Sequence, residues 1–303
     1  MTRKILATLD GSRTSESILP YLETLLRNED ANVTLARATL SDGLKEKQEV
    51  RSYLKGVAAG LEAKGAVVDT AILEGKPAEG IVTHAVQGGY DLIVMCTRGK
   101  TGLKRLILGS VTEEILRLSP KPVLVVHPLE RGAAAPAIRR IAVPLDGSHR
   151  SGSILPQVAD LAKAMGAKIS FVTVVSPTKK DDLPVEVVSE NIFREQKTLQ
   201  KRGLEVDIAI LYGDPVAETL GYAERNHADL VAISTHGRSG LDRLRFGSVA
   251  EKILRKSPLP LLVLRTAAIP KQYTLHKAGL NARRRALAVI ASEGEMKKGP
   301  YNR

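Results

Sequence analysis

The stretch YDLIVMCTRGKTGLKRLILGSVTEEILRLSPKPVLVV, residues 90–126, decides the fold because the chain carries it a second time. Residues 228–264 read ADLVAISTHGRSGLDRLRFGSVAEKILRKSPLPLLVL. A second pair agrees: ILATLDGSRTSESILP (5–20) returns as IAVPLDGSHRSGSILP (141–156). So long a period indicates a duplicated domain rather than a solenoid of short repeats.

The duplication sets the expected domain organisation. We expect one domain over residues 1–130, a second over 137–266, and a basic C-terminal tail over 267–303. The stretch RGAAAPAIRR (131–140), which is rich in small residues and contains proline, is the expected linker. After Ala267 the chain has eight basic and two acidic residues, so the tail supplies +6 of the formal charge of +12. The charge therefore indicates little about the two domains, and a nucleic-acid partner is expected only through the tail.

The bulk composition limits the class of protein. Hydrophobic residues make up 43% of the chain and charged residues 26%, which is typical of globular domains with an aliphatic core. No apolar run reaches the roughly 18 to 20 residues that a membrane span needs, so no membrane partner is expected. The start of the chain has no signal-peptide pattern, and the single cysteine, Cys96, excludes an intrachain disulfide. These features predict a cytoplasmic protein.

Apolar runs alternate with amphipathic helical stretches in each half. This alternation, with near-continuous Val/Ile/Leu runs such as LIVM and PVLVV, indicates parallel strands covered on both faces. The predicted fold is α/β, with two doubly wound, Rossmann-like domains in tandem. We expect PVLVV and PLLVL to pair the halves edge to edge around a pseudo-two-fold axis. In the first half the expected strands are Ile5–Leu9, Val33–Ala38, Val67–Leu73, Asp91–Cys96 and Val123–His127, and the expected helices are 15–27, 46–64, 78–87 and 110–118.

The triplet Gly99-Lys100-Thr101 suggests a phosphate-binding P-loop, but the suggestion fails. The motif G-x-x-x-x-G-K-[ST] needs a glycine five residues before Gly99, where the chain has Val94. The second copy replaces the triplet with Gly-Arg-Ser, and arginine is no equivalent of the P-loop lysine. Lys100 is left as a candidate neighbour of a phosphate.

Both copies instead keep a glycine, nine residues, and then Gly-Ser at a helix start. The pattern runs from Gly99 to Gly109-Ser110 and from Gly237 to Gly247-Ser248. We expect each serine to cap its helix, and the helix N-terminus to offer N–H donors and partial positive charge to an anion. Gly-Ser before a helix is by itself only a good N-cap, but the joint pattern, present twice, favours a phosphate cradle.

The motif G-2x-G-9x-G-[ST], after a DLIVM strand and with LDGS near the start, resembles the universal stress protein family. The resemblance covers residues 1–130 and 137–266, as in tandem members of the family, whose fold is like that of the adenine nucleotide alpha hydrolases. One departure is that the first motif glycine is Cys96 in one copy and Ser234 in the other. Both residues are small, so a ligand could still approach closely.

The resemblance implies a role for each matching position in binding ATP, with or without Mg²⁺. Asp10 and Asp146 would lie near the ribose or its phosphates, and Ala38 and Val174 would flank adenine. The alternative for each aspartate is an Asx turn that begins a helix. The resemblance assigns the phosphates and ribose to Gly99, Gly109, Ser110, Val111, Gly237, Gly247, Ser248 and Val249.

The sequence therefore predicts a stress-response protein that binds ATP or a related adenine nucleotide as a sensor or regulatory module. No general base is repeated in both halves and the histidines lack metal-ligand spacing, so we expect neither a catalytic residue nor a metal site. Cys96 is expected to be a small core residue. A homodimer or an intramolecular pair of halves is expected. Two alternatives stay open, namely a slow ATP hydrolase and a nucleotide-independent interaction protein with vestigial sites.

Overall fold

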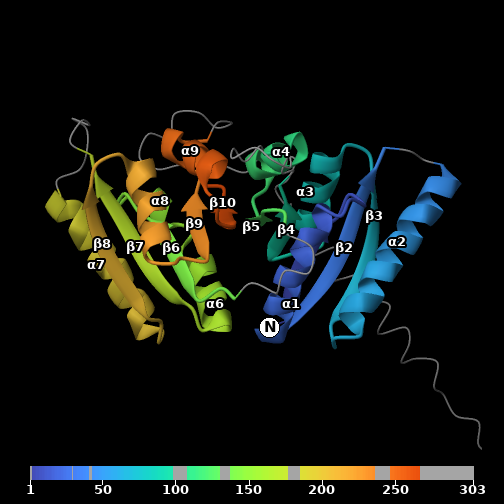
Figure 1. Cartoon of the computed structure of the whole chain (residues 1–303), viewed down its shortest axis with the longest axis horizontal. Helices are drawn as coiled ribbons and strands as arrows, with labels where there is room; N and C mark the ends of the chain where they lie inside the picture. The colour runs from blue at the N-terminus through green and yellow to red at the C-terminus, as the bar shows by residue number, and fades with distance from the viewer. Residues whose placement is uncertain are drawn as a thin grey trace, which may run out of the picture. The chain divides into compact units, whose positions relative to one another are not determined.

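A computed structural model describes residues 2–28, 30–40, 43–97, 108–129, 137–176, 185–235 and 246–266. The predicted Gly99 and Gly237 lie outside these ranges, as do Arg98, Lys100, His236, Arg238 and the tail. The described residues form one ten-stranded sheet in the order β3-β2-β1-β4-β5-β10-β9-β6-β7-β8 (Figure 1). The α/β fold and the tandem arrangement predicted from the repeats are thereby confirmed.

The first half contributes five strands and their connecting helices. Its elements are β1 (Arg3–Thr8), the 3₁₀ turn η1 (Ser15–Ile18), α1 (Leu19–Asn28), β2 (Ala31–Thr39), α2 (Leu44–Glu62), β3 (Val67–Glu74), α3 (Pro77–Gln87), β4 (Leu92–Cys96), α4 (Ser110–Leu118) and β5 (Val123–Val126). The expected elements are all present, with bounds shifted by a few residues. The expected helix at Ser15 begins as 3₁₀ because Ser15 and Ser12 hydrogen-bond locally before α1 starts.

The second half repeats this order. Its elements are β6 (Arg140–Pro144), α5 (His149–Gly152), α6 (Leu155–Met165), β7 (Lys168–Val175), α7 (Val185–Lys201), β8 (Val206–Tyr212), α8 (Pro215–Arg225), β9 (Leu230–Ser234), α9 (Ser248–Lys256) and β10 (Leu261–Leu264). The expected linker 131–140 overlaps this half at its end, because Ile138 is buried and Arg140 begins β6.

All pairs of neighbouring strands are parallel except one. β5 and β10 run antiparallel and join the halves, with Leu124 opposite Leu262 and Val125 opposite Leu261. These strands are the PVLVV and PLLVL runs, so the predicted edge-to-edge pairing is confirmed. The side chains of both strands are buried, which explains why the runs are apolar without alternation.

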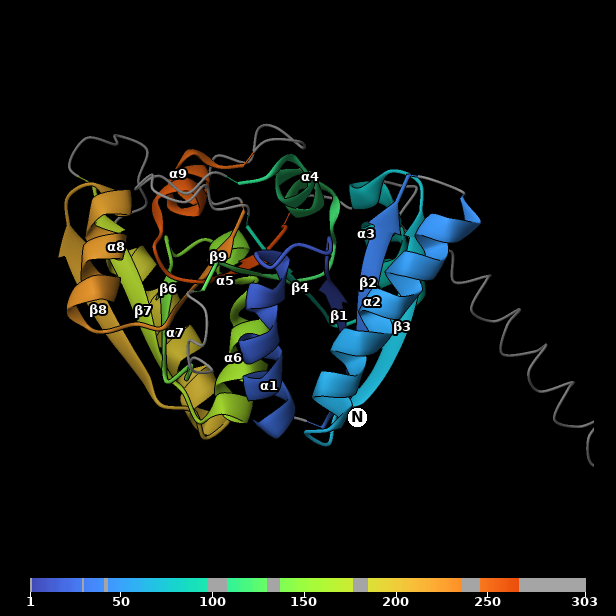
Figure 2. The same cartoon turned by 45° about the vertical axis from the view of Figure 1, so that its right-hand side comes forward.

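The helices cover both faces of the sheet. Figure 2 shows α1 and α2 in front of the first-half strands and α3 behind them. The helices α1 and α6 contact each other and lie side by side in both views, so the helical layer continues across the join of the halves (Figures 1 and 2). The core is aliphatic, as the scarcity of aromatics predicts. Phe171 is its one fully buried aromatic among the largest buried side chains, beside Ile5, Leu22, Leu54 and Ile115.

Candidate functional site

The loop after β1 holds Asp10 in an Asx turn. The carboxylate oxygen Oδ1 of Asp10 accepts the backbone N–H of Ser12 at 2.8 Å, and the Ser12 hydroxyl in turn accepts the N–H of Ser15 at 3.2 Å. Gly11 between them has φ +84°, a conformation in which a side chain is strained. The side chain of Asp10 is exposed at the carboxyl end of its strand, the edge at which α/β sheets bind ligands.

The loop after β6 repeats this geometry. Asp146 accepts the N–H of Ser148 at 2.9 Å and the Ser148 hydroxyl at 2.6 Å, and Gly147 has φ +77°. The Asx-turn interpretation is therefore correct for both aspartates. That interpretation does not replace the ligand role, because the turn fixes the position of a carboxylate at the carboxyl edge of the sheet. The contact with ribose stays a prediction.

Ala38 lies at the point where β2 continues past the end of β1. The carbonyl of Ala36 accepts the N–H of Leu9, and the carbonyl of Thr39 accepts the N–H of Gly75 on the opposite side. Peptide groups alternate in direction along a strand, so the N–H and C=O of Ala38 point toward the β1 side. β1 ends at Thr8, and these groups therefore face the region beyond its last residue.

The second half places Val174 in the same way. The carbonyl of Val172 accepts the N–H of Leu145, and that of Val175 accepts the N–H of Gly213. The peptide groups of Val174 consequently point past the end of β6, which ends at Pro144. In each half the residue predicted to flank adenine therefore offers one backbone donor and one backbone acceptor beside the aspartate loop.

The helices α4 and α9 begin without a side-chain cap, and here one sequence expectation is wrong. Ser110 and Ser248 were expected to cap their helices, but each is the first helical residue. The N-cap residues are Gly109 and Gly247, which have no side chain to accept a hydrogen bond. The first N–H groups of both helices therefore lack a side-chain acceptor from the cap, and the valine after each serine, Val111 or Val249, is half-buried in the first turn.

The carboxyl end of β9 brings the second-half components together. The N–H of Gly247 donates to the carbonyl of Thr235 at 2.8 Å, so α9 begins directly beside the strand end. The Ser234 hydroxyl lies 3.5 Å from the carbonyl of Ser151, which is in the helix that follows the Asp146 loop. The aspartate loop, the strand end and the helix N-terminus thus share one edge of the sheet.

Cys96 occupies the corresponding place at the end of β4. Burial and, to a lesser degree, the negative charge of Asp10 raise the pKa of the Cys96 thiol to about 12. A thiol with this pKa is protonated at neutral pH, which agrees with a packing residue and not with a nucleophile.

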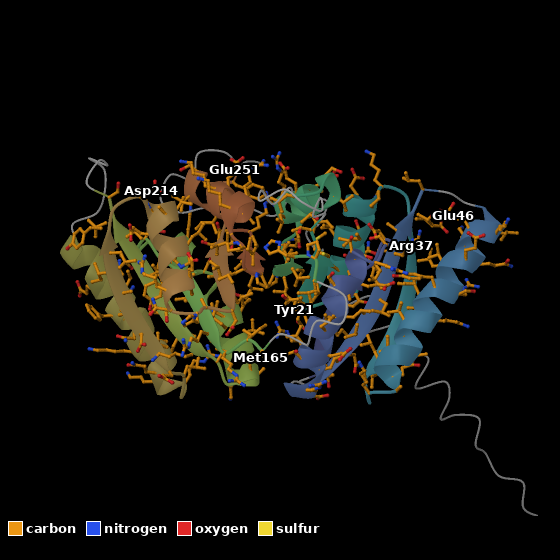
Figure 3. All side chains as sticks on the ribbon, viewed as in Figure 1. Tyr21, Arg37, Glu46, Met165, Asp214 and Glu251 are labelled. Carbon is orange, nitrogen blue, oxygen red and sulfur yellow. The ribbon has the colours of Figure 1, made fainter. Side chains whose placement is uncertain are left out.

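Sequence reasoning missed Arg37, which lies beside Gly11. A Cβ atom on Gly11 would come within 2.6 Å of Arg37 Nη1, and the guanidinium carbon lies 5.7 Å from the centre of the Tyr53 ring. Figure 3 shows Arg37 beside β2 and α2. The available signal was a lone charged residue inside the apolar strand ANVTLARAT, which the duplicate strand KISFVTVV lacks.

Comparison with known proteins identifies the class. The model of the universal stress protein family matches residues 1–127 and again residues 137–265. The chain therefore belongs to the universal stress protein family, whose members serve in stress responses, and it contains two copies of the family's domain.

Individual relatives agree with this assignment. Universal stress protein Slr1230 of Synechocystis is 29% identical over 181 residues, which cover 59% of this chain and 60% of that protein, less than two thirds of its length. Universal stress protein YxiE of Bacillus subtilis is 31% identical over 148 residues, covering 42% of this chain and 100% of that protein. A universal stress protein structure from Archaeoglobus fulgidus matches with a TM-score of 0.73 and 22% identity, covering 87% of this chain and 98% of that one, which shows the shared fold.

Among the described residues, no helix is both long enough and apolar enough to cross a membrane. In the same parts of the chain, no three His, Cys, Asp or Glu side chains gather in a way that could hold a metal ion.

Proposed function

We propose that each half binds ATP or a related adenine nucleotide beyond the carboxyl ends of β1 and β6, and that the protein acts as a stress-responsive binding module. One observation carries this proposal. Each half places a fixed aspartate, an outward-facing strand peptide and a helix N-terminus without a side-chain cap at one edge of the sheet. Because both copies keep this arrangement although their sequences differ at many other positions, a chance grouping is a poor explanation.

The strand peptides suit adenine. The Watson–Crick edge of adenine presents an amino donor next to a ring-nitrogen acceptor. The peptide groups of Ala38 and Val174 offer the complementary acceptor and donor, and they face the region beyond β1 and β6. Recognition through the backbone requires no particular side chain, which explains how alanine and valine can serve at equivalent positions.

The helix N-termini suit phosphate. The N–H groups of the first turn and the helix dipole together attract an anion. With glycine as the N-cap, no side chain of the cap competes for these donors, and the backbone can approach a ligand closely. Ser110 and Ser248 are exposed at this point, so each can add a hydroxyl donor to the backbone donors.

The aspartates suit the ribose. A carboxylate accepts hydrogen bonds from the 2′- and 3′-hydroxyls of a ribose, as in other doubly wound nucleotide-binding folds. One oxygen of Asp10 and of Asp146 is held by the Asx turn, so the orientation of the whole carboxylate is set before the ligand arrives.

The test is to denature the purified protein and identify released nucleotide by mass spectrometry, and to measure the thermal shift on adding ATP with and without Mg²⁺. We expect bound adenine nucleotide and a rise in Tm. The matched control is the double variant Ser110→Asp with Ser248→Asp, which puts a negative charge at both helix starts and should abolish the shift. If the wild type carries no nucleotide and shows no shift, the proposal is wrong and the vestigial-site alternative holds.

A further inference from the structure

The two halves differ at the aspartate loop, and the difference is one of charge. We propose that Arg37 makes the first site prefer the more highly phosphorylated adenine nucleotide, while the second site lacks this preference. The inference rests on the proposed nucleotide binding and adds to it a residue that determines specificity.

Arg37 lies close to both the aspartate loop and the ring of Tyr53. Its guanidinium lies against Gly11, the residue that follows Asp10, so closely that a Cβ on Gly11 would come within 2.6 Å of Nη1 and 2.9 Å of the guanidinium carbon. The guanidinium also lies over the ring of Tyr53, with 5.7 Å between its carbon and the ring centre. The cation is therefore fixed beside the loop.

The Tyr53 ring is itself held in place. The Tyr53 hydroxyl donates to the Glu16 carboxylate at 3.0 Å, which ties α2 to the turn that follows the Asp10 loop. Burial and the hydrogen bond to Glu16 raise the pKa of Tyr53, so its hydroxyl is protonated at neutral pH and remains a donor. Glu16 is thus engaged by Tyr53 and not by the guanidinium.

Among the described residues, Arg37 has no ion-pair partner. In the part of the chain that the structure describes, no carboxylate lies within ion-pair distance of its guanidinium, and the side chain is half-buried. A half-buried cation without an ion-pair partner projects its field into the adjoining site. A ligand that brings more negative charge to that site gains more binding free energy from this field.

The second half has a neutral arrangement in the same place. The residue 136 positions after Arg37 is Thr173, which is 4% exposed and whose hydroxyl oxygen has no hydrogen-bond partner among the described residues. There the loop is held by α7, where the side-chain amide of Asn191 donates to the carbonyl of Gly147 at 3.2 Å. Both loops are thus supported from the helix after the second strand, but only the first receives a positive charge.

The experiment isolates one site at a time. Ser248→Asp should disable the second site so that the first can be measured alone, and Ser110→Asp should disable the first. An acidic residue at a helix start repels phosphate without weakening the helix. Affinities for ATP and AMP are then measured by calorimetry at about 50 mM and about 300 mM salt. We expect the ratio of ATP affinity to AMP affinity to be about three- to tenfold larger at the first site than at the second. This difference between the sites should shrink at high salt.

Substitutions at position 37 assign the effect. In the Ser248→Asp background, Arg37→Thr copies the second half and should remove the excess preference for ATP, whereas Arg37→Lys should retain most of it. Tyr53→Phe, which keeps the ring and loses only the bond to Glu16, should change ATP and AMP affinity alike. In the Ser110→Asp background, Thr173→Arg should raise the preference for ATP.

The possible outcomes separate the two proposals. Circular dichroism and Tm show whether each variant is folded, and Thr173→Arg in the isolated second site keeps the proposal testable if Arg37→Thr unfolds. If nucleotides bind and Arg37→Thr shifts the affinities for ATP and AMP by the same factor, the specificity role is overturned while nucleotide binding stands. If neither isolated site nor the wild type binds ATP or AMP, both proposals fall.

Discussion

The imidazole of His127 joins the two halves, because its Nε2 lies 3.0 Å from the carbonyl oxygen of Leu259. A carbonyl oxygen can only accept a hydrogen bond, so Nε2 carries the proton and donates a hydrogen bond across the join of the two halves. The other ring nitrogen, Nδ1, then accepts from the hydroxyl of Thr97 at 3.3 Å. Both nitrogens of a neutral ring are satisfied in this way at the end of β5, beside the antiparallel pairing with β10.

This arrangement predicts lower stability in mild acid. Burial is the main cause that lowers the pKa of His127 below its ordinary value of 6.5. Below about pH 6.5 the unfolded chain therefore binds a proton that the folded chain does not, and the free energy of unfolding falls as the pH falls. The stabilisation is fully present above the unfolded pKa and is lost toward the lower folded pKa. Urea unfolding at a series of pH values measures this slope.

Replacing His127 separates its contribution from that of His84, whose pKa is also lowered by burial. His127→Gln keeps an N–H donor for Leu259 but cannot titrate, so the loss of stability below about pH 6.5 should become smaller. His84→Gln serves as the comparison within the first half. An unchanged pH slope in the His127→Gln variant would show that this ring is not the titrating group.

Asparagine and alanine should have different effects on stability when they replace Asp10 or Asp146. Asp10→Asn and Asp146→Asn keep an oxygen that can accept the Asx-turn bond, so the Tm should change little. Asp10→Ala and Asp146→Ala lose that bond and should destabilise by about 1 kcal/mol. The asparagine variants should weaken nucleotide binding by roughly fivefold, because a neutral acceptor forms a weaker hydrogen bond with ribose. A thermal-shift titration gives both quantities, and unchanged affinity would remove the aspartates from the binding site.

Gly11 and Gly147 form a matched pair for testing the position of Arg37. Both glycines have positive φ, at +84° and +77°, so alanine at either position should cost about 1–2 kcal/mol. Only at Gly11 does the new methyl group also meet the guanidinium, which must then move off the Tyr53 ring. Gly11→Ala should therefore lower the ATP preference of the first site as Arg37→Thr does, and Gly147→Ala should leave the preference of the second site unchanged. Equal effects of the two variants on preference would argue against a fixed guanidinium.

The thiol of Cys96 should be inert in the folded protein. With the pKa raised to about 12, almost no thiolate forms at about pH 8, and the side chain is also half-buried. Labelling by a thiol reagent should be at least about a hundredfold slower in the native protein than in denaturant. Rapid labelling of the folded chain, followed by mass spectrometry, would contradict the packing role.

The sequence predicted the architecture well because the repeat and the apolar strands are local signals. The joining strands could be identified from PVLVV and PLLVL, since buried central strands need continuous apolar runs. Ser110 and Ser248 show where such reasoning fails. A serine before an amphipathic run looks like an N-cap, but the extended backbone at Gly109 and Gly247 makes the glycine the N-cap, so each helix begins one residue earlier, at the serine itself.

Arg37 shows a second kind of limit. Its place inside a strand was visible in the sequence, but its meaning depends on Gly11 and Tyr53, which lie 26 residues before it and 16 after it. Only folding brings the ends of β1 and β2 and the face of α2 together. That this guanidinium has no ion-pair partner among the described residues is a property of the folded assembly, and no spacing of residues along the chain reports it.

The antiparallel pairing of β5 with β10 has a genetic consequence. In a homodimer built from one domain, every substitution appears in both subunits and the two sites stay identical. Here each domain finds its partner within the same polypeptide, so a single codon change alters one site alone. The pairs Arg37 and Thr173, Cys96 and Ser234, and His127 and Arg265 differ in this way. Covalent linkage thus allows the two proposed sites to specialise independently while the shared sheet stays symmetric.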